Sequence, residues 1–137
     1  MKRKLYMLIT LAALLLSACS AFSPAGDPLD GTSWKLTAYA GKDVLPGTNV
    51  TITFADGQAG GEAGCNGYGG TYEVDGEKIS FHEVASTLIL CTGPEGIMEQ
   101  EAEFLGSLNE AGRFELAGGR LQIFRSDGEA LTFVPAQ

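Results

Sequence analysis

The sequence predicts a mainly β fold: a small antiparallel sheet, barrel-like or strongly curved, with one packed α-helix. Short stretches of alternating apolar and polar residues recur through residues 30–135, and Asp-Gly pairs suited to tight hairpin turns separate several of them. One stretch, about residues 94–110, instead repeats its apolar residues at helical spacing. Because the expected connections are short, neighbouring strands should pair with one another, as they do in a small barrel.

Alternation predicts a series of strands before the helix. Trp34 and Leu36 fall on one face of the first strand, and Ile52 and Phe54 fall on one face of the second. The pair Asp75-Gly76 is expected to turn a later hairpin, while residues 41–47 are expected to form a loop. These strands are expected at residues 32–40, 50–54, 72–74, 78–81 and 84–90.

The stretch at about residues 94–110 is predicted to be the single helix, packed on the sheet. Thr92 suits the cap, Pro94 and Glu95 suit the first turn, and Gly112 suits the stop. The packed side is expected to carry Ile97, Glu101, Phe104, Leu105 and Leu108. The solvent side is expected to carry Glu99, Gln100, Glu103 and Glu110.

The chain is predicted to return to strands after the helix. Alternating apolar residues mark three short strands at residues 113–116, 121–124 and 131–134. Gly118-Gly119 and Asp127-Gly128 separate them and suit tight turns. Strands, one helix and further strands, all joined locally, complete the predicted architecture.

The N-terminus resembles the signal peptide of a bacterial lipoprotein. Three basic residues precede an apolar run, and the segment Leu-Ser-Ala-Cys that ends at Cys19 resembles a lipobox. A run of about twelve apolar residues rises only roughly 18 Å as a helix, short of the roughly 30 Å hydrocarbon core. We therefore expect residues 1–18 to be a lipoprotein signal peptide that is removed before Cys19.

Cys19 is the expected site of lipidation, with palmitate among the attached chains. Several acyl chains make a stable anchor, whereas one chain alone is marginal. Residues 19–29 are rich in Ser, Ala, Pro, Gly and Asp and are expected to form a lipidated tether. Ser20 and Ala21 favour the periplasmic side of an outer membrane in a cell that has one, so the expected location is the cell envelope.

The charge of the mature chain argues against nucleic-acid binding. The chain has nine basic and 17 acidic residues, and three of the basic ones leave with the signal peptide. Six basic and 17 acidic residues remain, a formal net charge of −11. A body this acidic repels phosphate backbones and anionic bilayers, which leaves the lipid as the expected membrane attachment.

Cys65 and Cys91 are the two cysteines that remain besides Cys19, and we expect them to form a disulfide. An exported compartment is oxidising, and a small domain gains from a covalent link. Closing a loop of about 27 residues stabilises a fold by roughly 3.5 kcal/mol in the chain-entropy model. The alternatives are two buried free thiols or a metal pair, and the metal is disfavoured because His82 has no ligand spacing around it.

Three segments of the sequence resemble the META domain family, over about residues 29–134. They are GTSW at residues 31–34, GCNGYGGTY at residues 64–72 and STLILC at residues 86–91, which the helix closely follows. The resemblance implies a small barrel-like β fold with a helix. The family includes a bacterial heat-shock protein and exported lipoproteins linked to stress or to tolerance of envelope-active drugs. No catalytic activity is established for it.

The glycine-rich run at residues 60–70 does not match a phosphate-binding loop. It lacks a Gly-Lys-Ser/Thr ending, and strand-like residues rather than a helix follow it. Its small residues are expected to let the backbone bend and pass close to Cys65. Asn66, whose side chain can turn onto nearby amides, and Tyr68 are the candidate contacts for a ligand or partner.

The residues offer little support for catalysis. His82 is the single histidine, no serine lies in a nucleophile elbow, and no cofactor or metal motif is present in the sequence. An enzyme would need His82 to face a cleft beside carboxylates. We therefore expect no catalytic residues and no cofactor.

The leading functional hypothesis is a non-catalytic envelope lipoprotein that acts in envelope maintenance or in stress or drug tolerance by binding a protein or small molecule. One alternative is a barrel that carries a small hydrophobic ligand, which needs an apolar cavity above about 300 Å³. Another is an inhibitor of a hydrolase, which needs an exposed ordered loop, expected at residues 64–70 or 93–96. The identity of the partner is not encoded in any motif.

Overall fold

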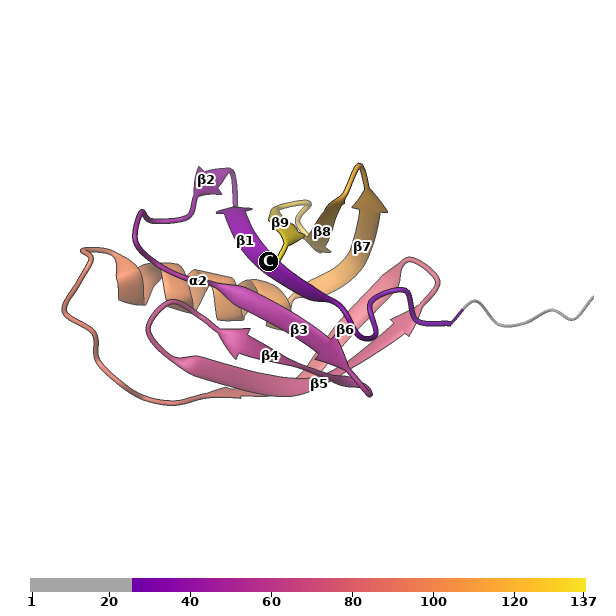
Figure 1. Ribbon diagram of the computed structural model, residues 1–137, viewed down its shortest axis with the longest axis horizontal. Coiled ribbons are helices and arrows are strands. Elements are labelled where there is room, and N and C mark those ends of the chain that lie inside the picture. The colour runs from indigo at the N-terminus through magenta and orange to yellow at the C-terminus, as the bar shows by residue number, and fades with distance from the viewer. Residues whose placement is uncertain (1–25) are drawn as a thin grey trace, which may run out of the picture.

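A closed antiparallel β-barrel with one helix is formed by residues 26–137, the part of the chain that the computed structural model describes (Figure 1). Eight strands follow the order β1-β3-β4-β5-β6-β7-β8-β9, and β9 pairs with β1 to close the barrel. The two-residue strand β2 pairs with β1 alone. The predicted mainly β fold with a single helix between strands is therefore confirmed for residues 26–137.

The elements have the following bounds. The strands before the helix are β1 (Ser33–Tyr39), β2 (Lys42–Asp43), β3 (Thr51–Ala55), β4 (Gln58–Glu62), β5 (Gly67–Asp75) and β6 (Lys78–Ser86). The helix is α2 (Ile97–Asn109), and the strands after it are β7 (Ala111–Ala117), β8 (Arg120–Arg125) and β9 (Ala130–Pro135).

Tight turns close the hairpins where the sequence predicts them. Asp56 and Gly57 join β3 to β4 with φ of 52° and 75°, and Gly118 and Gly119 join β7 to β8 with φ of 59° and 71°. Positive φ at both central residues matches the right-handed twist of the flanking strands. These turns fix the register in which each strand meets its neighbour.

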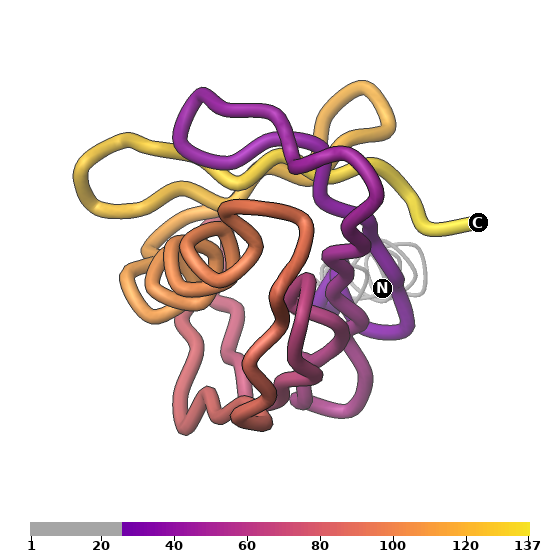
Figure 2. The backbone as a smooth tube through the Cα atoms, turned by 90° about the vertical axis from the view of Figure 1, so that its left-hand side faces the viewer, coloured from indigo at the N-terminus to yellow at the C-terminus, as the bar shows by residue number. Residues whose placement is uncertain are grey.

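The helix lies where the barrel has its shortest strand pairing. Strands β6 and β7 share a single pair in register, Lys78 with Arg113, whereas β5 and β6 pair along most of their length. Helix α2 contacts β6, β8 and β9, and Figure 2 shows it almost end-on beside these strands. The helix therefore covers this side of the barrel. No helix within residues 26–137 is long and apolar enough to cross a membrane.

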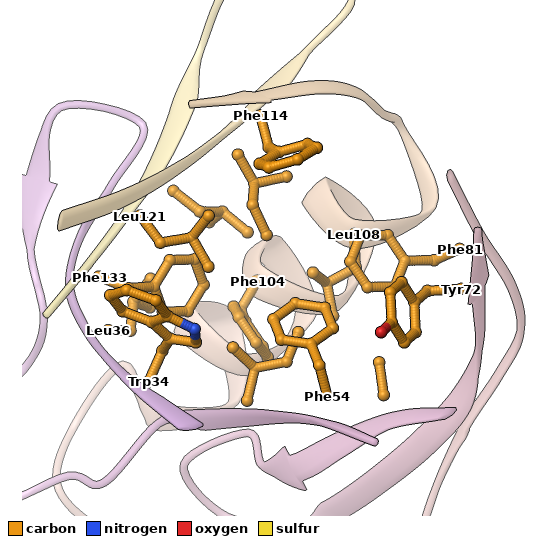
Figure 3. Packing of buried hydrophobic residues seen from close by; sticks show 14 of the residues in the cluster. Trp34, Leu36, Phe54, Tyr72, Phe81, Phe104, Leu108, Phe114, Leu121 and Phe133 are labelled. Atoms are coloured by element: carbon orange, nitrogen blue, oxygen red, sulfur yellow. The ribbon is translucent and has the colours of Figure 1, made fainter. Parts of the chain in front are cut away.

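Large side chains fill the barrel interior (Figure 3). Phe54, Phe104 and Phe133 are fully buried. Phe54 meets Tyr72 edge-to-face with ring centroids 4.8 Å apart, a favoured geometry for aromatic pairs. Because Phe104 comes from α2, its burial fastens the helix to the barrel.

The packed part of the barrel begins a few residues before Asp30, so it includes the last residues of the predicted tether, which was expected at residues 19–29. Leu29 is fully buried, and its backbone N–H donates to Asp27 Oδ1 at 2.8 Å. The other carboxylate oxygen of Asp27 accepts a hydrogen bond from the Tyr72 hydroxyl. Burial and the nearby Asp27 raise the pKa of Tyr72 above its ordinary value of about 10. The signal peptide and Cys19 lie outside the described residues.

Several predicted boundaries were wrong. The helix begins at Ile97, after Gly96 with φ of 86°, so Thr92 does not cap it and Pro94 and Glu95 precede its first turn. It ends at Asn109, and the predicted stop, Gly112, lies in β7. Positive φ at Gly96 lets the chain reverse into the helix without a side-chain cap.

Two strands and one buried side chain were also missed. Strand β2 lies in the predicted loop, and β4 was not expected because its sequence, QAGGE, lacks alternating β-branched residues. Gln100, expected on the solvent side of the helix, is buried. Its Oε1 accepts from the backbone N–H of Leu45 at 2.7 Å, and its Nε2 donates to Thr48 Oγ1 at 3.0 Å. These hydrogen bonds make burial of a polar side chain tolerable.

The first prediction concerns the attachment of the helix. Phe104→Ala should lower the free energy of unfolding by about 3–5 kcal/mol, because it empties the centre of the core. Leu116→Ala, at a position 42% exposed on β7, should change it by less than about 0.5 kcal/mol. Urea unfolding measures both values, and a loss below about 1 kcal/mol for Phe104→Ala would contradict this role of the helix.

Candidate functional site

Three consecutive apolar side chains protrude between β6 and α2. Leu88 is 97% exposed, Ile89 60% and Leu90 79%, and they lie within residues 87–91, which we call the apolar loop. No charged residue occurs between positions 87 and 94. Contiguous exposed apolar side chains are uncommon on soluble domains and mark interaction sites. The apolar loop is therefore the candidate functional site.

The side chain of Asn66 holds the apolar loop in place through hydrogen bonds to Thr87 and Ile89. Its Oδ1 accepts hydrogen bonds from the backbone N–H of Ile89 at 2.7 Å and from Thr87 Oγ1 at 2.8 Å. Its Nδ2 donates to the backbone oxygen of Ile89 at 3.0 Å and to Glu101 Oε1 at 2.6 Å. A carboxamide has two donor hydrogens and two acceptor lone pairs, so the hydrogen-bonding capacity of Asn66 is fully used.

Glu101 of α2 completes this arrangement from the helix. Its Oε2 accepts from the backbone N–H groups of Cys65 at 3.1 Å and of Asn66 at 2.7 Å. Asn66 is 1% exposed and Glu101 is 5% exposed. A buried carboxyl group is costly unless hydrogen-bonded, and here both oxygens have amide donors. We call Asn66 and Glu101 the buried clamp.

A disulfide bonds Cys65, the residue before Asn66, to Cys91 at the end of the apolar loop. Cys65 and Cys91 are joined at an S–S distance of 2.06 Å, with Cα atoms 6.0 Å apart. At the other end of the loop, the backbone N–H of Thr87 donates to the backbone oxygen of Gly67 at 3.0 Å. Both ends of the loop are thus fixed to the segment that carries Asn66.

The glycine-rich segment provides the backbone that this arrangement needs. Gly64 has φ of 117°, in the left-handed region that favours glycine, and it lies in the turn between β4 and β5. The backbone N–H of Ala63 donates to the backbone oxygen of Asn66 at 2.8 Å and closes this turn. At Gly61 a side chain would collide with the backbone oxygen of Thr51 on β3. The glycines therefore allow close strand approach and a tight turn beside Cys65.

Tyr68, the second candidate contact, is also held inside the protein. Its hydroxyl donates to the backbone oxygen of Thr51 at 2.8 Å, and its ring meets that of Phe104 edge-to-face at 5.3 Å. Burial raises the pKa of Tyr68 above its ordinary value of about 10. The structure directs both Asn66 and Tyr68 toward other parts of the chain, and their contact with a ligand or partner stays a prediction.

The sequence analysis missed the residues that make this site. Residues 87–90 were assigned to a strand because of their apolar run, yet β6 ends at Ser86. The loops suggested for an inhibitor, residues 64–70 and 93–96, flank the apolar loop rather than supply its protruding side chains. One signal was visible: Glu101 falls on the apolar side of the helix, where a carboxyl group requires a buried partner.

The other polar features lie elsewhere on the surface. His82 is exposed and its ring nitrogen is 3.2 Å from Ser80 Oγ. Two surface pockets of about 380 and 460 Å³ are present; Asp75, Lys78 and Ser80 are among the residues lining the first, and Lys35 and Asn49 are among those lining the second. Within residues 26–137, no three His, Cys, Asp or Glu side chains are grouped to hold a metal.

Comparison with known proteins gives a family match and a fold match. The family model described as META domain matches residues 27–137. No curated protein matches the chain significantly. An NMR structure of a protein from Burkholderia xenovorans is 29% identical, with 80% of this chain and 84% of that chain covered and a TM-score of 0.65.

Two further solved structures show similarity of fold alone. A second NMR structure is 21% identical with a TM-score of 0.64, and the match covers 78% of this chain and 91% of that one. A crystal structure of a DUF4847 family protein from Bacteroides vulgatus ATCC 8482 is 16% identical with a TM-score of 0.57, covering 78% and 94% of the two chains.

The second prediction tests the buried clamp. Asn66→Ala should lower the free energy of unfolding by about 2–4 kcal/mol, because it removes four hydrogen bonds and leaves Glu101 Oε1 without its donor. Asn49→Ala is the matched control, since Asn49 is exposed. Urea unfolding of the oxidised proteins measures the difference. Equal stability of the two variants would show that the clamp does not hold the fold.

Proposed function

The chain belongs to the META domain family, and on this premise we propose that it is an exported lipoprotein whose non-catalytic domain binds a protein in the cell envelope. The observation that carries the proposal is the apolar loop, with Leu88 and Leu90 exposed on a buried and fully hydrogen-bonded support. A preformed loop loses little conformational entropy on binding, so less of the free energy gained by burying its apolar area is offset by ordering.

The N-terminal segment that resembles a lipobox supports the proposed membrane attachment. Acylation of Cys19 would anchor a chain whose packed part is described from Gly26 onward. Gly26 lies seven residues after Cys19, and a fully extended chain of seven residue steps spans at most about 25 Å. The domain would thus work close to a bilayer, in the periplasm if the cell has an outer membrane.

A protein partner fits better than a small hydrophobic cargo. A carrier needs an apolar cavity inside the barrel, whereas Phe54, Phe104 and Phe133 occupy this interior. The two surface pockets include charged residues in their linings and lie apart from the apolar loop. Carriage of a ligand therefore receives less support than binding through the loop.

Inhibition of a hydrolase is the second candidate function, because one observation favours it. The protruding side chains are flanked by a disulfide, and a rigid extended loop is the shape that a substrate-binding cleft accepts. Envelope maintenance and tolerance to stress or drugs are compatible with either kind of protein binding. His82, exposed and outside both pockets, gives no support to catalysis by this domain.

The third prediction tests the anchor and the disulfide together. The protein extracted from its own membrane should have the mass of residues 19–137 plus a diacylglyceryl group on the Cys19 thiol and one acyl chain on its amino group, and reduction should add the mass of two hydrogens. Cys19→Ala should abolish the acylation. Mass spectrometry of the intact protein measures each change. An unmodified chain, or one cleaved at a different residue, would refute the anchor.

A further inference from the structure

The hydrogen bonds to Ile89 reveal the backbone conformation of the apolar loop. Both the N–H and the C=O of Ile89 bond to the carboxamide of Asn66, at 2.7 and 3.0 Å. In an antiparallel sheet, a residue exchanges both of these bonds with the residue opposite, because its N–H and C=O point to the same side. Asn66 thus substitutes for one residue of a neighbouring strand, and Ile89 is extended.

An extended Ile89 orients its two neighbours. Along a strand, successive residues direct their backbone groups to opposite edges and their side chains to opposite faces. The N–H and C=O of Leu88 and Leu90 therefore point away from Asn66. Within residues 26–137, no hydrogen bond engages the backbone N–H of Leu88 or Leu90, and both side chains are largely exposed.

Resting on the protein-binding function proposed above, we infer that the apolar loop binds by strand addition. Residues 88–90 would join an unpaired strand edge in a partner protein through the backbone groups of Leu88 and Leu90. The two leucine side chains, which share one face, would enter apolar pockets beside that edge. In this mode the main-chain hydrogen bonds supply affinity and the pockets supply specificity.

Charge indicates which residues surround the strand edge and the apolar pockets of the partner. The loop itself is uncharged, but Glu95 and Glu99 are exposed on the segment that follows it. The partner site is therefore an apolar cleft with a neutral or basic rim, because an acidic rim would be repelled. A second copy of this chain is disfavoured, since the mature chain has a formal net charge of −11.

Position argues against the anchoring bilayer as the occupant. Figure 1 shows the segment between β6 and α2 at one end of the long axis, and the chain enters the barrel at the opposite end. A tether of at most about 25 Å that enters there places the apolar loop at the end of the domain farther from the anchor. This position favours a protein in the aqueous space over the anchoring bilayer as the occupant.

Photo-crosslinking in the cell of origin tests the partner class. The full-length protein carries p-benzoylphenylalanine at position 88 or at position 116, where Leu116 is the matched exposed apolar residue on β7. Position 88 should give one dominant protein adduct, mapped by mass spectrometry to a strand edge of the partner, and position 116 should not. No adduct at position 88 would overturn both the binding function and this inference, and adducts with lipid would overturn the protein partner.

A backbone variant separates strand addition from simple apolar contact. Leu90→Pro removes the N–H at position 90, and proline favours the extended conformation that Ile89 already has. Leu90→Ala shortens the side chain but keeps the N–H. Affinity for the purified cross-linked partner should fall about tenfold more for Leu90→Pro than for Leu90→Ala, the value of one lost hydrogen bond. Equal losses in two folded, oxidised variants would refute strand addition while leaving the binding function intact.

Discussion

The hydrogen bond between the carboxamide of Asn66 and the carboxyl group of Glu101 is the interaction on which the end of the barrel that carries the apolar loop depends. It joins the turn after β4 to helix α2, and the remaining bonds of Asn66 reach the apolar loop. Buried polar networks stabilise a fold when every member is satisfied and are costly when one is not. Because the clamp has no spare donor or acceptor at Asn66, the turn, the helix and the loop adopt their positions together.

The disulfide and the clamp constrain the apolar loop in different ways. The bond between Cys65 and Cys91 limits how far the end of the loop can move from the turn, chiefly by restricting the unfolded chain. It does not fix which way the backbone of Ile89 faces. The Asn66 carboxamide does so, and this orientation directs Leu88 and Leu90 into solvent. Aromatic side chains fill the interior of the domain, whereas the three apolar side chains of Leu88, Ile89 and Leu90 are exposed and contribute nothing to the core.

The sequence predicted the fold class and the single helix, but it did not predict two of the strands or the candidate site, and particular residues show why. The Asp-Gly and Gly-Gly turns and the alternation around Trp34 and Ile52 are local signals, so they predicted hairpins and pairing between neighbouring strands. Strand β4 was missed because its sequence contains glycines instead of residues that favour strands. Glycine is needed there because β3 and β5 approach closely, as at Gly61, and this requirement comes from the tertiary structure. Gln100 and Leu90 were misplaced for the same reason. Burial of an amide and exposure of a leucine depend on partners distant in sequence, which periodicity does not record.

Amide hydrogen exchange of the oxidised protein tests the central claim most directly. The account predicts that the amide of Ile89 exchanges at least about a hundredfold more slowly than those of Leu88 and Leu90, because Asn66 alone protects it. Asn66→Ala should bring the exchange rate of position 89 to that of its neighbours while Cys65 and Cys91 stay bonded. Three equally fast amides in the unsubstituted protein would contradict the account, since the apolar loop would then be held by its disulfide and not by the buried clamp.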